Sequence, residues 1–328
     1  YKLGDKEEER IERCFIHEKT NDFPDIGSYE QDLHLIKRYR EFLLNAVEHS
    51  FADKTIVLDG AFGAAHRIAP DVFRRAGASV IAANCVDNGL SINRNCGAVY
   101  PHNLARKVLR YKADMGFAFD GDADRLIAVD EHGDVIDGDM ILCALAKYFD
   151  AQGKLPCRTA VGTSHTNMAI ENDLKAHGIS LVRTDIGDKY VLARLLEKGY
   201  SLGGEQSGHI ILKDYATTGD GILTAIALTN MLISENKTLA EGVKIRLYPQ
   251  ENKNVPVEDK FRVINSEELS KQVAKYNALL AGKGRLMIRA SGTEPKIRVM
   301  VESKDEALNR EVAASLVSTI EKINGEKA

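Results

Sequence analysis

Apolar residues between positions 29 and 50 recur three or four residues apart, at Leu33, Ile36, Phe42, Leu43 and Val47. This spacing predicts an amphipathic helix. The next stretch, TIVLDGAFGAAHRIAPDVFRRAGASVIAAN, contains an apolar run, a glycine turn, a helical pattern and a second apolar run. That order predicts a βαβ unit in a mostly parallel sheet.

The alternation of strands and helices continues to about residue 233. Two apolar runs flank an acidic turn at 115–136, and a helix is expected from about Asp139 to Phe149. A second block predicts a strand at TAVGT, a helix to His177, a strand at ISLVRT and a helix to Glu197. It ends with the glycine-rich stretch SLGGEQSGHIIL and a strongly apolar helix, ILTAIALTNMLI.

The pattern changes beyond about residue 250. NVPVEDKFRVI and RLMIRASGTEPKIRVMVES predict antiparallel strands, accompanied by two amphipathic helices. The polar stretch RLYPQENKN is expected to be a linker, and the residues before about 28 form no complete domain. We therefore predict two mixed or parallel α/β domains followed by a small C-terminal α+β domain with an antiparallel sheet. The expected segments are 1–34, 35–135, 136–250 and 251–328.

Length and composition narrow the class of protein. A chain of 328 residues is expected to form two or three domains. Its 44 basic and 48 acidic residues nearly cancel, which argues against nucleic acid or a membrane surface as a partner. No apolar run approaches the roughly 18–20 residues that span a bilayer. The five cysteines are scattered, which favours a reduced, cytoplasmic location.

An acidic cluster is the first candidate for chemistry. In FAFDGDADRLIAVD, Asp120, Asp122 and Asp124 alternate with small residues, and Arg125 follows at once. In an extended chain three such carboxylates point the same way, and their repulsion favours a bound divalent ion. Aspartates without His or Cys favour magnesium, manganese or calcium over zinc. The metal and the arginine together suit an incoming phosphoryl group.

Three other interpretations fit parts of the acidic cluster. An EF-hand also has acids at alternate positions, but it needs glycine where Arg125 stands, and helices where apolar strands flank the cluster. A phosphatase of the haloacid-dehalogenase type begins with a strand and an Asp-x-Asp pair. The third interpretation is a solvated acidic turn at the end of a hairpin.

A second candidate site is the stretch RASGTEPKIRVMVE at 289–302. A strand ends, the chain turns through a Ser-Gly-Thr sequence, and a second strand follows. Backbone N–H groups, two hydroxyls and two guanidinium groups make a cradle for a phosphate that does not react. The residues are Arg289, Ser291, Gly292, Thr293 and Arg298. A hairpin turn with incidental arginines is the alternative.

The glycine-rich stretch LGGEQSGHIIL is the third candidate. Its glycines permit a tight backbone from which Glu205 and Ser207 project, a combination suited to neighbouring hydroxyl groups of a polyol. A structural turn with a hydrogen-bonded His209 is an equal alternative. Asp188 and Lys189 follow a predicted strand, where an aspartate usually caps a helix.

Taken together, the three motifs resemble the α-D-phosphohexomutase superfamily, the phosphosugar mutases. DGDADR resembles its metal loop, GEQSGH its sugar loop and RASGTEPKIRV its phosphate loop, in the same order along the chain. Gln206 and the segment GLSINRNCGAVYP are similar to the members that act on glucosamine phosphates. The segment departs from that pattern at 98–100, where Ala-Val-Tyr replaces the more usual Ser-Thr-His.

The resemblance implies interconversion of glucosamine 6-phosphate and glucosamine 1-phosphate for UDP-N-acetylglucosamine synthesis, through a phosphoserine and glucosamine 1,6-bisphosphate. It implies one Mg²⁺ on Asp120, Asp122 and Asp124, with Arg125 facing the phosphoserine. The sugar loop would hold hydroxyls and the phosphate loop the remote phosphate. The remaining residues expected in the cleft are Asp188 and Lys189, and His165 as a substrate contact or proton-transfer group.

The family's serine nucleophile lies in a loop reading roughly Ser-x-Ser-His-Asn-Pro, and nothing before the metal loop matches it. The start, YKLGDKEEERIE, resembles the family's sequence shortly after that loop, so 1–34 is expected to be a remnant of the N-terminal domain. Ser164 in TSHTN follows the metal loop and lacks the proline, so we expect a cleft-lining turn. The chain alone is therefore expected to be inactive, with the missing domain open to supply by an intact protein.

Two further functions remain open from the sequence. One is a non-catalytic protein that binds sugar phosphates. The other is a relative of phosphomannomutase or phosphoglucomutase, because the motifs do not select one hexose phosphate.

Overall fold

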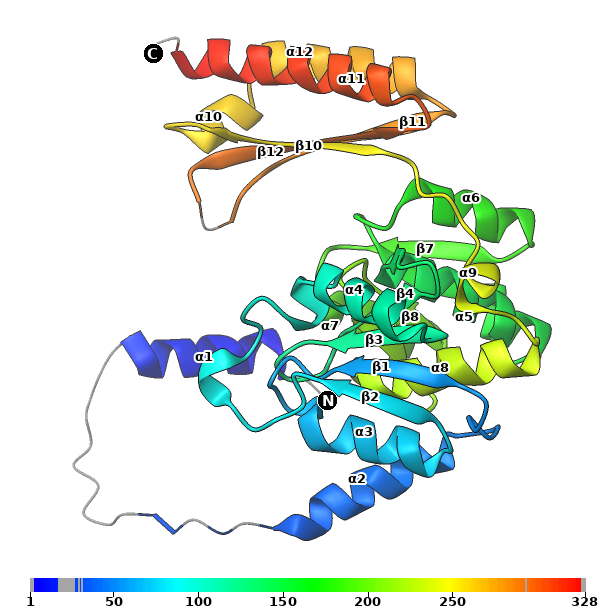
Figure 1. The fold of residues 1–328 in the computed structure, drawn as a ribbon. Helices are drawn as coiled ribbons and strands as arrows, with labels where there is room; N and C mark the ends of the chain where they lie inside the picture. Colours follow the sequence, from blue (N-terminus) through cyan, green and yellow to red (C-terminus); the bar gives the residue numbers. More distant parts are fainter. Residues whose placement is uncertain (1–2, 17–26, 29, 31, 293, 326–328) are drawn as a thin grey trace. The chain divides into compact units, whose positions relative to one another are not determined.

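The computed structural model describes residues 3–16, 27, 28, 30, 32–292 and 294–325 (Figure 1). The chain divides into two compact units, which are described separately. Unit 1 comprises Tyr1–Thr166 and Leu174–Lys244, and unit 2 comprises Asn167–Asp173 and Ile245–Ala328. Among the described residues, no helix combines the length and apolar character needed to cross a bilayer.

Unit 1 contains two sheets with their helices. The elements of the first sheet region are α1 (Asp5–Ile16), α2 (Leu33–Asn45), β1 (Thr55–Asp59), α3 (Ala65–Arg75), β2 (Ser79–Ala83), α4 (His102–Tyr111), β3 (Met115–Phe119), β4 (Leu126–Asp130) and β5 (Val135–Ile136). The strand order is β2-β1-β3-β4-β5, parallel from β2 to β3 and antiparallel from β3 to β5. The predicted βαβ unit and the hairpin around the acidic turn are both confirmed.

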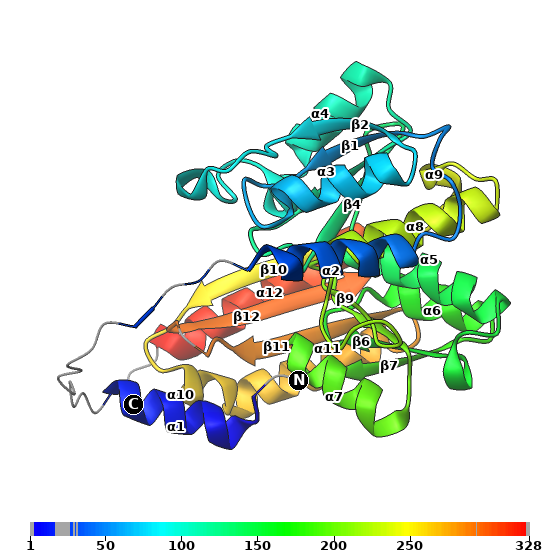
Figure 2. The same cartoon turned by 90° about the horizontal axis from the view of Figure 1, so that it is seen from below.

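Helices cover both faces of the first sheet, which explains its continuous apolar strands. Every residue of β3 and β4 is buried. Val57 and Val129 pack with α4 on one face, while the Phe117 ring meets Phe73 of α3 on the other, with ring centroids 5.8 Å apart. Figures 1 and 2 show α3 and α4 on opposite sides of β1.

The second sheet of unit 1 has the order β7-β6-β8-β9. Its region comprises α5 (Gly138–Ala151), β6 (Thr159–Thr163), β7 (Ser180–Thr184), α7 (Asp188–Lys198), β8 (Leu202–Gly204), β9 (Ile210–Leu212), α8 (Gly221–Ser234) and α9 (Leu239–Gly242), while α6 (Met168–Ala176) extends from unit 2 into unit 1. Aspartates cap the two most buried helices: Asp137 accepts a hydrogen bond from the Met140 N–H, and Asp220 from the Leu223 N–H. The mixed sheet agrees with the predicted fold class.

Unit 2 is built on an antiparallel sheet in the order β10-β12-β11. Its elements are β10 (Gln250–Pro256), α10 (Lys260–Ile264), α11 (Glu267–Leu280), β11 (Gly284–Ala290), β12 (Lys296–Ser303) and α12 (Glu306–Gly325). Helices α11 and α12 lie on one face (Figure 1), where alternate residues of β12, such as Val299, enter the core. The predicted C-terminal α+β domain with an antiparallel sheet is confirmed.

The structure differs from the sequence predictions at residues 246–254 and in α1. The predicted linker RLYPQENKN is wrong in its second half, because Gln250–Asn254 pair with β12 as the edge strand β10. Helix α1 was not predicted, because its sequence DKEEERIERCFI is dominated by charges. The stretch DFPDIG, whose sequence predicts a loop, lies almost wholly outside the described residues.

Candidate functional site

The acidic cluster forms a tight turn between β3 and β4. The expectation of an extended chain is wrong here, because Ala123 has a φ of +63°, in the left-handed region. This turn still gathers the three carboxylates: one oxygen each from Asp120, Asp122 and Asp124 lies within 4.8 Å of the others. The predicted convergence is therefore reached by a turn instead of by strand geometry.

Hydrogen bonds balance the negative charge of this turn only in part: the Arg125 N–H donates to Asp120 Oδ1 at 3.2 Å. Burial, followed by the carboxylates of Asp124 and Asp122, raises the pKa of Asp120 to about 6. Asp124 Oδ1 is buried and has no hydrogen-bond partner among the described residues. Arg125 Nε lies 3.6 Å from both Asp120 Oδ2 and Asp124 Oδ1, too far for a hydrogen bond. A buried carboxylate oxygen without a hydrogen bond, in an all-oxygen donor set, fits a hard divalent cation such as Mg²⁺.

Backbone contacts join the sugar loop (Gly203–His209) to Leu126, directly after the metal loop (Asp120–Arg125), and to Gly138 at the start of α5. The Leu126 N–H donates to Gly208 O at 3.0 Å, and the Gly138 N–H donates to Gln206 O at 3.0 Å. Gly208 has a φ of +94°, and a Cβ there would lie 2.3 Å from Leu126 O. Only glycine therefore allows the two loops to approach this closely.

The polar residues of the sugar loop are held on its outer side. Glu205 is half-buried and Ser207 is exposed. Glu205 Oε1 accepts a hydrogen bond from the Gly187 N–H at 3.0 Å, which brings it beside the start of α7. Asp188 is the first residue of α7, and Gly187 is its N-cap, so Asp188 is not the cap that its sequence context predicted. Lys189 Nζ lies 3.8 Å from Glu8 Oε2 of α1.

His209 is hydrogen-bonded, as one of the two sequence interpretations predicted, but its contact with the metal loop was not predicted. It is 3% exposed, and its Nδ1 lies 3.1 Å from Asp124 Oδ2. The Gly219 N–H donates to His209 Nε2 at 3.0 Å. Nε2 is also 3.5 Å from Asp188 Oδ2, but a nitrogen that accepts from a backbone N–H carries no proton of its own to donate. The Gly219 contact assigns the acceptor role to Nε2, which leaves Nδ1 as the donor toward Asp124.

A cavity of about 540 Å³ opens beside the metal loop. Asp122 and Asp124 line it, together with Tyr39 of α2 and the segment Thr218–Asp220. The Tyr39 hydroxyl donates to Asp220 Oδ2 at 2.9 Å. Burial, followed by the charge and hydrogen bond of Asp220, raises the pKa of Tyr39, so the hydroxyl keeps its proton.

Ser164 and His165 occupy the turn after β6, as predicted for a turn at TSHTN. The Ser164 N–H donates to Thr184 O at 2.8 Å, and the His165 N–H donates to Thr163 Oγ1 at 3.2 Å. Both residues are half-buried.

The phosphate cradle lies in unit 2, at the end of β11 and the start of β12. Arg289 and Arg298 are direct cross-strand partners, and burial, followed by the Arg298 charge, lowers the pKa of Arg289. Arg298 Nε is buried with no hydrogen-bond partner among the described residues. Ser291 is buried and its N–H donates to Lys296 O. Thr293 lies outside the described residues, and Gly292 is in the turn.

Lys260 is a cation near this cradle that was not predicted. Its Nζ donates to Ser291 O at 2.7 Å and to Gly292 O at 3.2 Å, and so fixes the turn. The two guanidinium groups repel one another, and only Arg298 has a carboxylate beside it, Glu294 Oε2 at 3.4 Å from Nη2. The excess of positive charge fits the binding of an anion.

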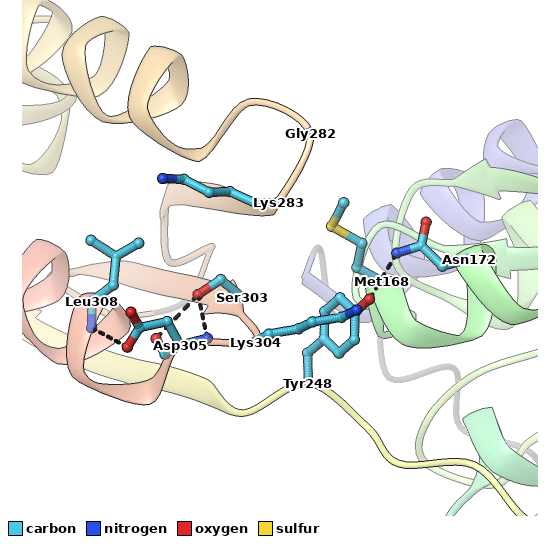
Figure 3. A pocket seen from close by; sticks show the side chains of 9 residues that line it. All are labelled: Met168, Asn172, Tyr248, Gly282, Lys283, Ser303, Lys304, Asp305 and Leu308. Carbon is cyan, nitrogen blue, oxygen red and sulfur yellow. Dashed lines mark hydrogen bonds between the residues drawn. The ribbon is translucent and has the colours of Figure 1, made fainter.

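A second cavity, of about 420 Å³, also lies in unit 2 (Figure 3). Lys283 and Lys304 line it with Tyr248, and the Asn172 side-chain amide donates to the Tyr248 hydroxyl at 3.1 Å. Its lining contains none of the predicted site residues.

Comparison with known proteins identifies the class of protein to which the chain belongs. Family models for phosphoglucomutase/phosphomannomutase match in chain order: alpha/beta/alpha domain II at 37–133, alpha/beta/alpha domain III at 137–248, and the C-terminal domain at 253–319. A phosphoglucomutase/phosphomannomutase family protein from Burkholderia thailandensis superposes with a TM-score of 0.79 at 21% identity, covering 100% of this chain and 72% of that one. Fold and motifs together define a phosphohexomutase, a class of isomerases.

The more similar sequences name the particular family. Phosphoglucosamine mutases from Caldanaerobacter subterraneus and Caldicellulosiruptor saccharolyticus are 43% and 45% identical over 98% of this chain, which spans 73% of each relative. The chain belongs to the phosphoglucosamine mutase family. The fold is also that of the N-acetylphosphoglucosamine mutase of Aspergillus fumigatus, solved with GlcNAc-6P and magnesium (TM-score 0.70, 20% identity, 90% of this chain and 67% of that one).

Proposed function

We propose that the chain acts in the interconversion of glucosamine 6-phosphate and glucosamine 1-phosphate, through a phosphoserine and glucosamine 1,6-bisphosphate. The product would supply UDP-N-acetylglucosamine synthesis. The observation that carries this proposal is the cluster of three carboxylates beside Arg125, in which the buried Asp124 Oδ1 has no hydrogen bond among the described residues. The names of the similar sequences support the choice of glucosamine phosphate.

In this proposal unit 1 holds the reacting end of the sugar. Asp120, Asp122 and Asp124 would bind one Mg²⁺, which when bound neutralises charge on phosphoryl oxygens. Arg125 would bind the same phosphoryl group through its guanidinium, which the neighbouring acids orient. Glu205 and Ser207 would bind the sugar hydroxyls. Asp188, Lys189 and His165 would contact the substrate, with His165 in proton transfer.

Unit 2 is proposed to hold the phosphate that does not react. Arg289 and Arg298 would bind its oxygens, with Ser291, Gly292 and Thr293 supplying hydroxyls and backbone N–H groups. We also propose that functional domains run over 35–135, 136–250 and 251–328, after a short N-terminal segment, 1–34.

Binding by these 328 residues tests the proposal directly. We expect calorimetry to show one Mg²⁺ site, which Asp122→Asn removes and the exposed control Asp53→Asn retains. Glucosamine 6-phosphate should bind more tightly than glucose 6-phosphate or mannose 6-phosphate, and Arg298→Gln should weaken all three. Equal Mg²⁺ binding by the Asp122→Asn variant would contradict the metal site, and equal affinity for the three sugars would contradict the glucosamine assignment.

Phosphoryl transfer by these 328 residues is tested separately from binding. We propose that residues 1–328 alone bind without transferring a phosphoryl group, because their sequence contains no match to the family's serine loop. An assay with Mg²⁺ and glucosamine 1,6-bisphosphate should therefore stay at background. Phosphate incorporated at Ser164 would refute this proposal and make Ser164 the nucleophile.

A further inference from the structure

We propose that Tyr39, Asp220, Gly219 and His209 form a relay that positions the carboxylate of Asp124 for the metal ion. This inference rests on the metal site of the proposed function. It adds three segments to that site, α2, the TTGDG turn at 217–221 and the end of the sugar loop, all of which belong to unit 1.

The relay ends on a metal-binding carboxylate. His209 Nδ1 faces Asp124 Oδ2 at 3.1 Å, while Asp124 Oδ1 is buried without a hydrogen bond among the described residues, 3.6 Å from Arg125 Nε. One oxygen is therefore held by the imidazole and the other is presented to a cation. A histidine that hydrogen-bonds a metal ligand in this way fixes the direction of the ligand's free lone pairs.

Gly219 sets the tautomer of His209. Its N–H donates to Nε2 at 3.0 Å, which leaves the proton on Nδ1. A Cβ at Gly219 would lie 2.6 Å from ring atoms Cε1 and Nε2, so any side chain here displaces the imidazole. The position therefore requires glycine for contact with the ring, although its φ is not in the left-handed region.

The TTGDG turn also holds the metal loop from a second side. The Gly221 N–H donates to Ala123 O at 2.9 Å, and a Cβ at Gly221 would lie 2.3 Å from Arg125 O. Ala123 is the residue of the metal loop in the left-handed conformation. One turn thus supports both the strained backbone of the loop and the orientation of its third carboxylate.

Asp220 and Tyr39 fix the turn itself. Asp220 Oδ1 accepts from the Leu223 N–H at 2.9 Å as the cap of α8, and Oδ2 accepts from the Tyr39 hydroxyl at 2.9 Å. Among the described residues, the Tyr39 hydroxyl makes the one side-chain hydrogen bond that connects α2 to this turn. Removal of that hydroxyl should loosen the Asp220 carboxylate and, through Gly219, the imidazole.

Mn²⁺ titration of the 328-residue chain, followed by electron paramagnetic resonance, tests the relay. We expect Gly219→Ala to weaken Mn²⁺ binding roughly 10- to 100-fold and Tyr39→Phe roughly three- to tenfold. The matched controls are Tyr111→Phe, an exposed tyrosine, and Gly89→Ala, where nothing lies within 4 Å of the new methyl group. Both should bind within about twofold of the unmodified chain.

A second readout does not depend on the metal. Nitrogen-15 NMR of the metal-free chain should show a neutral His209 protonated at Nδ1, assigned from the signal lost in His209→Gln. The Tyr39→Phe variant should shift that signal toward a mixture of tautomers. Its thermal unfolding serves as the control that the variant is folded. A proton on Nε2 in the unmodified chain, or unchanged Mn²⁺ affinity in both variants, overturns the relay.

The titration separates this inference from the function on which it rests. If the unmodified chain binds no Mn²⁺, or binds it equally after Asp122→Asn, the metal site fails and the relay loses its role. If Asp122→Asn abolishes binding while Tyr39→Phe and Gly219→Ala bind normally, the metal site stands and the relay alone is wrong.

Discussion

Arg289 and Arg298 face each other across β11 and β12, while four residues earlier on β11 Arg285 faces Glu302. Both pairs lie on the face of the unit 2 sheet opposite the residues that pack against α11 and α12. One end of this face therefore carries a repelling pair and the other an attracting pair. The repelling end has Glu294 beside Arg298 at 3.4 Å but keeps an excess of positive charge, which agrees with its sequence resemblance to a phosphate loop.

The Arg298→Gln variant should show two separate effects of this repulsion, one on stability without ligand and one on phosphate binding. Without ligand, the variant should gain about 0.5 kcal/mol in the free energy of unfolding, because like charges on opposite strands destabilise a sheet. Inorganic phosphate should raise the melting temperature of the unmodified chain but not that of the variant. Arg310→Gln, which alters an exposed arginine of α12, is the control and should keep the phosphate effect. A phosphate-dependent shift retained by Arg298→Gln would place the anion elsewhere.

Arg285→Met should destabilise unit 2 by about 3 kcal/mol, because it leaves the Glu302 carboxylate buried without its cation. Glu302 is 0% exposed, and its Oε1 lies 3.0 Å from Arg285 Nε and 2.7 Å from the Met168 N–H. The double variant Arg285→Met, Glu302→Gln should lose less than the single variant. Urea denaturation measures both; an equal loss in the two variants would show that the charge is not the cause.

Gly208→Ala should disrupt the contact between the metal and sugar loops. The new Cβ meets Leu126 O at 2.3 Å, and alanine is strained at a φ of +94°. A loss of about 2 kcal/mol is expected, with faster hydrogen exchange at the Leu126 amide, which donates to Gly208 O. Gly325→Ala, where a Cβ meets nothing within 4 Å, should leave both measurements near those of the unmodified chain.

Asp71→Asn should lower stability in a pH-dependent manner. Burial opposes ionisation of Asp71, but hydrogen bonds from Arg75 and Arg40 outweigh it and lower its pKa below 3.8. The lowered pKa means that the folded chain binds the proton less readily than the unfolded chain. The ion pairs therefore stabilise the fold above pH 3.8, and this contribution disappears as the pH falls through the lowered value.

At neutral pH the Asp71→Asn variant should have a free energy of unfolding about 0.5 kcal/mol below that of the unmodified chain. The difference is small because the side chains of Asp71, Arg40 and Arg75 are partly exposed. Thermal unfolding between pH 7 and pH 3 measures it. A difference that grows on acidification would reverse the assigned sign.

Much of the fold could be predicted because buried strands have distinctive sequences. β1 and β3 are apolar along nearly their whole length, because helices cover both faces of their sheet. The first part of β10 escaped prediction because it belongs to an edge strand rich in exposed polar residues, and its pairing with β12 leaves no hydrophobic pattern there.

The site could be predicted where its functional residues lie close together in the sequence. Three carboxylates within five residues are visible in the sequence, whatever conformation gathers them. The left-handed φ of Ala123 is not, because alanine rarely adopts it without support from neighbouring segments. Nor are the bonds from His209 to Asp124 and from Tyr39 to Asp220, which join residues 85 and 181 positions apart.

The junction between the metal and sugar loops relies on main-chain atoms of Leu126, Gly208, Gly138 and Gln206. The exposed side chain of Ser207 can therefore be exchanged without removing a bond of that junction, whereas the Gln206 side chain donates to Asp137 Oδ2 at 3.2 Å. Randomising position 207, with Gln206 and every glycine kept, offers a route to enzymes retuned toward other hexoses on an undisturbed ion-binding frame.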